Sequence, residues 1–132
     1  MIVPYTELPD AAGGWPRPLV DVTVADMDEA RVPCLVDSGA LHTLLPRWVA
    51  RGGGIDLRRA THRSLAVATT TVEAVFVGTR LTVADHSWEA EVGFCEPWPY
   101  SWGLLGQLSF FRHFTVVFRA ADFELEVTPL QR

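Results

Sequence analysis

Hydrophobic and polar residues alternate over much of this chain, which is the pattern of β-strands that bury one face. Turn-forming residues interrupt the alternation at short intervals. The predicted strands are residues 19–24, 31–36, 81–84, 88–94, 114–118 and 123–127. The chain is therefore expected to fold as a mostly β domain.

The connections between these strands are predicted from their turn chemistry. Turns are expected at residues 26–29, 78–80, 85–87 and 121–122, and a loop at residues 96–102. Residues 64–77 are rich in Val and Thr and too long for one typical strand. The tip of a hairpin is therefore predicted near Thr69–Thr71.

Two short segments have the pattern of helices. Residues 46–51 begin with a proline and are followed by three glycines, which favours a short helix that ends there. Residues 106–113 are expected to form one or two helical turns. Residues 1–18 form a lead rich in Pro and Gly, and no internal repeat or linker follows. We expect one domain over residues 1–132.

The composition excludes several classes of protein. The chain of 132 residues is 48% hydrophobic and 20% charged, which excludes a disordered chain. No apolar run approaches the ~18 residues of a membrane span. The first residues lack the basic start and apolar stretch of a secretory signal. With two cysteines and no C-x-x-C motif, we expect reduced, buried thiols in the cytoplasm.

The positive charges all come from one type of residue. All 11 cationic side chains are arginines, no lysine is present, and the net charge is −5. An acidic protein repels phosphate backbones, so nucleic acid is not an expected partner. The absence of lysine beside abundant Arg, Ala and Val is typical of a GC-rich bacterial genome.

One acidic residue breaks the pattern. Residues 32–36 are a continuous apolar run, as in a strand buried on both faces, and Asp37 follows at once with Ser38 and Gly39. A carboxylate at the end of a buried strand is costly unless hydrogen bonds or a shared proton relieve it. Asp-Ser-Gly is also good turn chemistry, so the surrounding sequence must decide its role.

The surrounding sequence resembles that of the aspartic proteases. Residues 35–40 (Leu-Val-Asp-Ser-Gly-Ala) are similar to their active-site signature, in which two apolar residues precede Asp-(Thr/Ser)-Gly-Ala. Leu104-Leu105-Gly106 resembles the second signature and lies 65 residues beyond Gly39. Residues 104–118 look like the matching segment of bacterial retropepsin-like proteins. The resemblance covers residues 19–129 and implies a small closed β-barrel of the retropepsin-like type with one or two short helices.

The resemblance implies an endopeptidase. In this family two aspartates share one proton around a water molecule, which attacks the peptide bond. Only one Asp-(Ser/Thr)-Gly occurs here, so a homodimer is expected in which each chain supplies Asp37. Ser38 would hydrogen-bond across the dimer, and Gly39 would let a peptide or protein substrate approach closely.

The expected substrate contacts lie in two places. Ala40, Leu41 and His42 follow the signature, and Thr69, Thr70 and Thr71 belong to the hairpin that would cover the substrate as a flap. The resemblance implies no metal and no other cofactor.

Two departures from the family pattern keep a second hypothesis open. The flap tip, residues 68–71, contains no glycine, and Leu41 and His42 stand where retroviral members carry acidic residues. Both favour a catalytically inactive module of the same fold that binds peptides or dimerises. A third hypothesis, an unrelated small β-barrel binding protein, would require both motif matches to be accidental.

Other chemistry has little support in the sequence. The four histidines show no metal-ligand spacing with one another or with the cysteines. Residues 51–54 lack the Lys-Ser/Thr of a phosphate loop. No motif supports Ser38, Ser64 or Cys34 as a nucleophile. Trp98 and Trp102 are candidates for lining a groove or a dimer interface.

Overall fold

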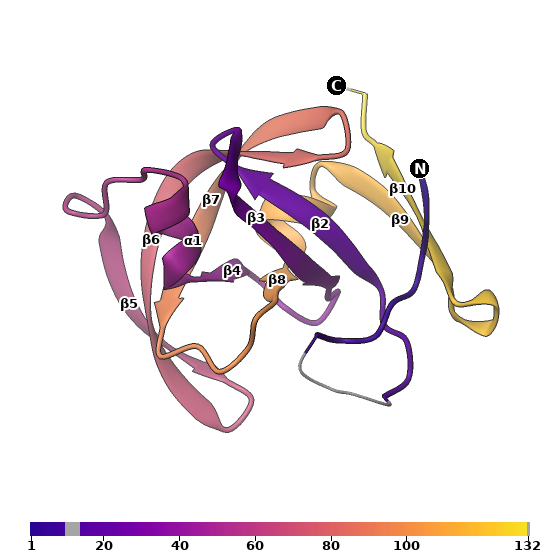
Figure 1. Cartoon of the computed structure of the whole chain (residues 1–132), viewed down its shortest axis with the longest axis horizontal. Coiled ribbons are helices and arrows are strands. Elements are labelled where there is room, and N and C mark those ends of the chain that lie inside the picture. Colours follow the sequence, from indigo (N-terminus) through magenta and orange to yellow (C-terminus); the bar gives the residue numbers. More distant parts are fainter. Residues whose placement is uncertain (10–13, 132) are drawn as a thin grey trace.

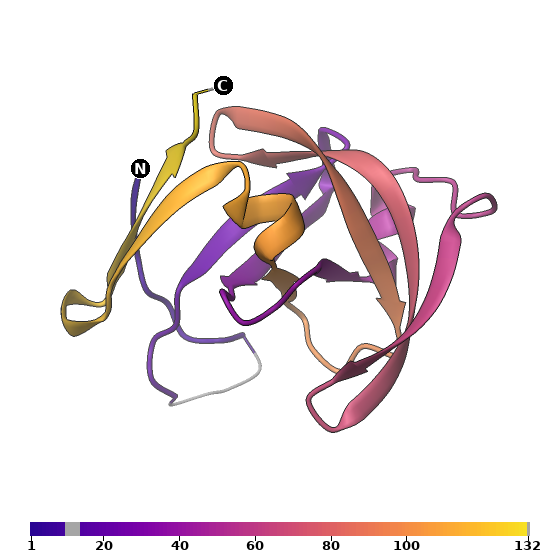
Figure 2. The same cartoon turned by 180° about the vertical axis from the view of Figure 1, so that it is seen from behind.

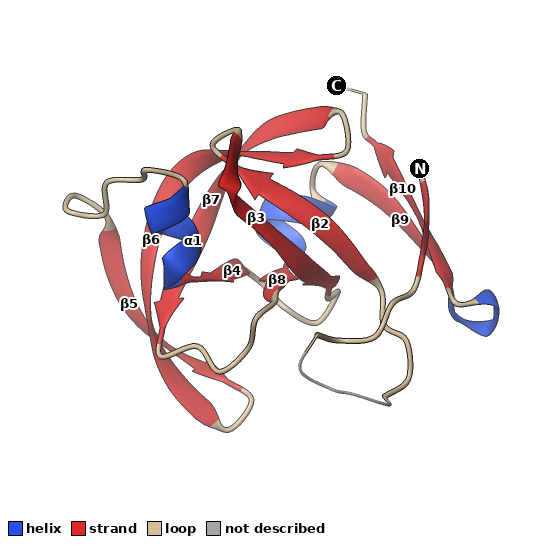
Figure 3. Ribbon diagram, in the orientation of Figure 1, coloured by secondary structure: helices blue, strands red, loops and turns tan. Residues whose placement is uncertain are grey.

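Strands dominate the structure (Figures 1 and 3). The computed structural model describes residues 1–9 and 14–131, so residues 10–13 of the predicted lead, together with Arg132, lie outside the described residues. The strands are β1 (Ile2–Pro4), β2 (Leu19–Val24), β3 (Met27–Val36), β4 (Thr43–Pro46), β5 (Thr61–Val67), β6 (Thr70–Val83), β7 (His86–Glu96), β8 (Gly103–Leu105), β9 (Phe114–Arg119) and β10 (Glu124–Pro129). The helical segments are α1 (Arg47–Gly52), the π-helix η1 (Gln107–Phe111) and the 3₁₀ turn η2 (Ala120–Asp122).

Most strands form one ring. The hydrogen-bonded order is β2-β3-β8-β4-β7-β6-β5, and an additional pairing of β2 with β6 closes the ring. Among the strands of the described residues, β5 pairs only with β6, and it continues the sheet outside the ring. The mostly β fold predicted from the sequence is confirmed, and the ring agrees with the retropepsin-like type.

The core fills this ring. Along β2 the alternating residues Val20, Val22 and Val24 are buried, because successive side chains of a strand point to opposite faces. The largest fully buried side chains include Phe94 and Phe110. Burial of these apolar side chains is the main force that stabilises the ring.

A separate three-stranded sheet lies beside the ring, in the order β1-β10-β9 (Figure 2). Its first strand comes from the predicted lead, and Ile2–Pro4 pair with Glu124–Glu126. Leu125 and Val127 of β10 are buried in the main core. The start and the end of the described chain are thus held against the same hydrophobic core.

The first hairpin turns earlier than predicted. β2 covers the predicted residues 19–24, but β3 starts at Met27 and not at Arg31. Ala25 and Asp26 form the turn, with φ angles of 54° and 55°. Positive φ at both central residues is the tight turn whose twist suits a hairpin, so two residues are enough where the sequence predicted four.

The predicted turn at residues 78–80 is wrong. β6 runs unbroken through this segment, with Gly78 paired to Glu91 and Thr79 paired to Ala90. The long partner strand β7 satisfies the backbone here, and a glycine weakens a strand without ending it. The sequence also did not predict β4 and β8, which are four and three residues long. The helical segment predicted at residues 106–113 is the π-helix η1.

Candidate active site

Asp37 lies directly after β3, at the start of the loop of residues 37–42, which we term the Asp37 loop. β3 pairs in parallel with β8, with Val36 opposite Leu105. The N–H of Asp37 donates to the carbonyl oxygen of Leu105 at 3.1 Å. The two sequence motifs, far apart along the chain, are therefore in direct contact.

The residues after β8 hold the other half of this loop. The N–H of Gln107 donates to the Ala40 carbonyl at 2.9 Å, and the N–H of Leu108 donates to the Leu41 carbonyl at 3.0 Å. The side-chain amide of Gln107 also donates to the carbonyl of Ser38 at 2.6 Å. Three residues of the Asp37 loop are thus fixed by two residues of η1.

Gly106 allows this close contact. A Cβ atom at residue 106 would lie 2.3 Å from the carbonyl oxygen of His42, which no side chain tolerates. The N–H of Gly106 donates to the hydroxyl of Thr43 at 3.1 Å, and Thr43 is fully buried. The Leu-Leu-Gly motif is therefore a structural support of the Asp37 loop.

The carboxylate of Asp37 is oriented by its own loop. Its Oδ1 accepts the N–H of Gly39 at 2.9 Å, and the side chain is only half-buried. Ser38 beside it is exposed. The loop thus presents a fixed carboxylate to solvent, with a hydroxyl beside it that is open to a partner.

A groove separates the Asp37 loop from the β5–β6 hairpin. It has a volume of about 300 Å³. Gly39, Ala40, Leu41 and His42 line one side, and residues 65–68 of the hairpin line the other. The structure therefore places Ala40, Leu41 and His42, three of the predicted substrate-binding residues, along one groove. Asp37 is not part of its lining, but Gly39, which donates its N–H to Asp37, is.

The turn of the hairpin lies about one residue before the centre predicted near Thr69–Thr71. Ala68 and Thr69 form the turn, and Thr70 and Thr71 begin β6. All three threonines are exposed, and the groove is lined by the residues just before them. Contact of Thr69, Thr70 and Thr71 with substrate stays a prediction.

Sequence reasoning missed the lining residues Leu65, Ala66 and Val67. The available signal was the apolar alternation of Leu65 and Val67 next to the tip. That alternation shows that one face of the strand is apolar, and in the structure Leu65 and Val67 pack against a second core cluster that includes Leu44 and Phe76, while residues 65–68 also line the groove. The flap prediction therefore identified the hairpin that borders the groove, but Leu65, Ala66 and Val67 were not among its residues.

Both cysteines are unsuited to nucleophilic chemistry. Burial raises the pKa of the Cys95 thiol to about 12. Burial also raises the pKa of the Cys34 thiol, and this rise is larger than the lowering by its hydrogen bond with the backbone of Gly103. The reactive thiolate form is therefore scarce at neutral pH.

The described residues offer no other obvious chemical centre. Among residues 1–9 and 14–131, no group of three or more His, Cys, Asp or Glu side chains could hold a metal ion. Within the same residues, no helix has the length and apolar character needed to cross a membrane. Trp98 donates its indole N–H to the carbonyl of Trp102 at 2.8 Å, so this pair orders the loop before β8.

Comparison with known families decides between a fold of the aspartic protease type and an unrelated small β-barrel. Residues 20–107 match the family described as aspartyl protease. The chain belongs to the aspartyl protease family. The matched range contains the Asp37 loop, the β5–β6 hairpin and the Leu-Leu-Gly motif of this aspartyl protease domain. No curated protein matches the chain closely enough to be reported as a relative.

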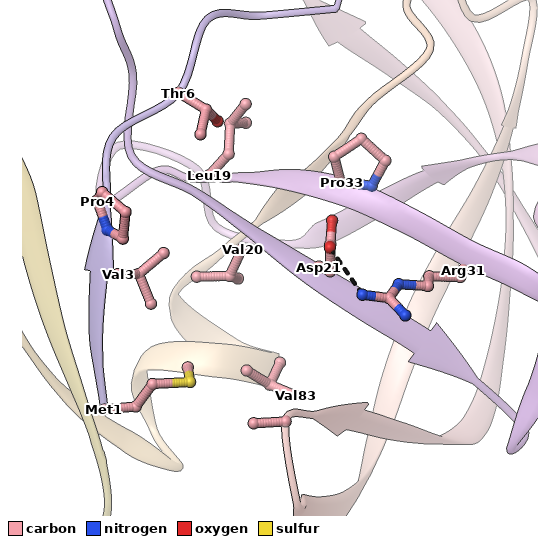
Figure 4. Close-up of a pocket in the computed structure, with 11 residues that line it drawn as sticks. Met1, Val3, Pro4, Thr6, Leu19, Val20, Asp21, Arg31, Pro33 and Val83 are labelled. Carbon is pink, nitrogen blue, oxygen red and sulfur yellow. Dashed lines mark hydrogen bonds and ion pairs between the residues drawn. The ribbon is translucent and has the colours of Figure 1, made fainter.

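A second hollow of the aspartyl protease domain lies apart from this groove (Figure 4). Its volume is about 340 Å³, and most of the side chains around it are apolar. The charged side chains at its edge, Asp21 and Arg31, form an ion pair with each other at 3.0 Å. No residue of the Asp37 loop lines it, so the groove is the better candidate for the active site.

Proposed function

We propose that the chain is an aspartic endopeptidase that acts as a homodimer, with Asp37 of each subunit forming the catalytic pair. The observation that carries this proposal is the Asp37 loop, held by residues 105–108 and bordered by a groove. The sequence contains one Asp-Ser-Gly triplet, so the second carboxylate must come from a second chain.

The proposed reaction uses the two carboxylates in different protonation states. Two adjacent like charges are unfavourable, so the pair holds one proton. The ionised carboxylate takes a proton from a water molecule, whose oxygen attacks the carbonyl carbon of the scissile peptide. The protonated carboxyl hydrogen-bonds the carbonyl oxygen, and a proton then passes to the departing amine. This requirement for one shared proton places the fastest cleavage at mildly acidic pH.

The surrounding residues support this chemistry. The N–H of Gly39 stabilises and orients the Asp37 carboxylate. The exposed hydroxyl of Ser38 is available for a hydrogen bond to the other subunit. An extended peptide would lie between the loop and residues 65–68, held by main-chain hydrogen bonds.

The test is cleavage of a peptide library, read by mass spectrometry. Asp37→Asn removes the carboxylate but preserves its size, and is expected to lower the cleavage rate at least about a hundredfold. Asp28→Asn is the matched control, because Asp28 is an exposed aspartate near the start of β3, the strand that Asp37 follows. This control is expected to cleave like the parent chain, and a transition-state mimic such as pepstatin is expected to inhibit both.

One observation favours the inactive module. Ala68 occupies the turn of the hairpin in place of glycine, which stiffens the segment that must open for substrate. If Asp37→Asn cleaved as fast as the parent, Asp37 would be a turn residue only. If neither chain cleaved but both bound peptides in the groove, the protein would be a peptide-binding module.

A further inference from the structure

The arginines of this acidic protein are concentrated in one segment. Residues 47–63 contain five of the eleven arginines and one of the sixteen acidic residues. They form α1, the loop that follows it and the start of β5. In Figure 1 this part lies at the far end of the ring from β9 and β10. The segment is therefore positively charged in a chain whose net charge is −5.

Three of these arginines surround one hollow, which we term the arginine hollow. Its volume is about 360 Å³, and Arg47, Arg51 and Arg58 line it with Asp56 as the single acidic residue. Its apolar lining is Ala50, Ile55 and Leu57, which belong to the main core or pack against it. The hollow is thus lined both by arginine side chains and by aliphatic side chains that belong to the core or pack against it.

The positive charge of this hollow is only partly compensated. Arg58 pairs with Asp56 at 2.8 Å, and Arg47 contacts Glu96 at 3.5 Å. Arg51 is exposed and has no ion pair within the described ranges 1–9 and 14–131. Arg47 and Arg51 also stand four residues apart on α1, where like charges destabilise a helix. Arg51 lies in the last turn of α1, where a cation is favoured, so its position suits the helix and leaves its charge open to a partner.

An aromatic hollow lies on the other side of the same two arginines. It has a volume of about 320 Å³, and its lining includes Arg47, Arg51, Trp48 and Trp98, with Glu96, the ion-pair partner of Arg47, as its one acidic residue. The side chain of Trp48 is 43% exposed. Guanidinium groups bind carboxylates in a planar, paired geometry, and indoles and aliphatic floors accept apolar side chains. Together the two hollows fit a polypeptide on which carboxylates and apolar side chains lie close together.

We propose that the arginine hollow and the aromatic hollow form a docking site for an acidic polypeptide segment with two neighbouring carboxylates and adjacent apolar residues. A nucleic acid fits less well, because its continuous charge would extend beyond the arginines onto an acidic surface. The site shares no lining residue with the groove at Asp37. The inference therefore goes beyond the proposed function, and binding here does not require cleavage.

The test is equilibrium binding of a fluorescein-labelled peptide, measured by fluorescence anisotropy on the Asp37→Asn chain so that no peptide is cleaved. The probe is a decapeptide that contains two adjacent Glu residues flanked by Leu and Trp. The comparison peptide carries Gln at both Glu positions. The acidic peptide is expected to bind about tenfold more tightly, and this advantage is expected to shrink with added salt.

Two sets of substitutions locate the site. The double variant Arg51→Gln with Arg58→Gln is expected to remove the tenfold advantage. The matched control is the double variant Arg31→Gln with Arg17→Gln, which removes the same number of positive charges. Both side chains are exposed and lie outside the two hollows. This control is expected to retain the advantage, and circular dichroism of both double variants is expected to match the parent.

Three results would overturn the proposal. Equal binding of the Glu and Gln peptides would show that the arginines do not select carboxylates. An equal loss in the control double variant would show a general effect of net charge. Tighter binding of a single-stranded oligonucleotide of the same charge would assign the surface to nucleic acid. Absence of cleavage by the parent chain would contradict the proposed function and leave this inference unaffected.

Discussion

At the scale of single residues, the Asp37 carboxylate shows how a charge is tolerated beside a buried strand. Val36 is 3% exposed, yet the next residue carries a carboxyl group. A charge placed in an apolar interior would be strongly unfavourable. Here the chain leaves the core at this point, the carboxylate is half-exposed, and the N–H of Gly39 donates to it. The exposure of the loop and the N–H of Gly39 therefore stabilise the carboxylate, which has no ion pair among residues 1–9 and 14–131.

The closest steric contact of the site predicts a stability effect. Gly106→Ala is expected to lower the free energy of unfolding by about 2–3 kcal/mol, because the new Cβ meets the backbone of His42. Gly78→Ala is the control, since nothing lies within 4 Å of a Cβ there, and it is expected to be neutral or slightly stabilising. Urea denaturation measures both, and equal stabilities of the two variants would contradict the tight contact.

The buried thiols lead to a prediction about reactivity. Near pH 8 a thiol whose pKa is raised to about 12, as for Cys95, is almost entirely protonated, and Cys34 is shifted in the same direction. Ellman's reagent is therefore expected to modify both at least about a hundredfold more slowly in the native protein than in urea. Rapid modification of the native chain would show that the core around β3 or β7 opens readily.

At the scale of elements, the β5–β6 hairpin combines a well-supported base with a turn of strained geometry. Along β6, residues 73–83 pair with β7 on one edge, whereas β5 pairs with β6 alone. The turn at Ala68 has a φ of 53°, a conformation that disfavours any residue with a Cβ. Pairing on both edges of β6 thus ends before the tip of the hairpin, while Ala68 restricts the backbone of the turn itself.

This turn predicts a substitution that increases stability. Ala68→Gly is expected to raise the free energy of unfolding by up to about 1 kcal/mol, because glycine adopts positive φ without a steric cost. Ala66→Gly, two residues earlier in β5, is expected to lower it by about 0.5–1 kcal/mol, as usual for glycine in a strand. Thermal unfolding of the two variants measures the difference, and a loss of stability in both would contradict the strain.

Elements defined by their own sequence pattern were predictable, and elements defined by distant partners were not. The alternation of β2 was sufficient to predict that strand, and the apolar run before Asp37 was sufficient to predict where β3 ends. Burial of β3 on both faces was wrong, because Pro33 and Leu35 are only half-buried. β4 and β8 are short and gain their structure from pairing with β7 and β3, far away in the sequence. The groove contacts of Leu65 and Val67 depend on where the hairpin folds, which local periodicity does not contain.

At the scale of the whole molecule, one chain provides half of the proposed catalytic pair. The cleavage rate per chain is therefore expected to rise with chain concentration and to level off when the dimer is complete. Sedimentation measured over the same concentrations is expected to show a monomer–dimer transition with the same midpoint. A strictly monomeric chain with full activity would contradict the shared site.

The parallel pairing of β3 with β8 also determines at which stage of folding the Asp37 loop becomes ordered. The loop around Asp37 is complete only after residues 103–108 have joined it, and a contact between segments so far apart in sequence is slow to close. Hairpins such as β6–β7 join neighbouring segments and are favoured to form earlier. While the chain is being synthesised, Asp37 therefore emerges long before the residues that hold it in place. The nascent chain therefore carries Asp37 without its structural support until residues 103–108 have been made.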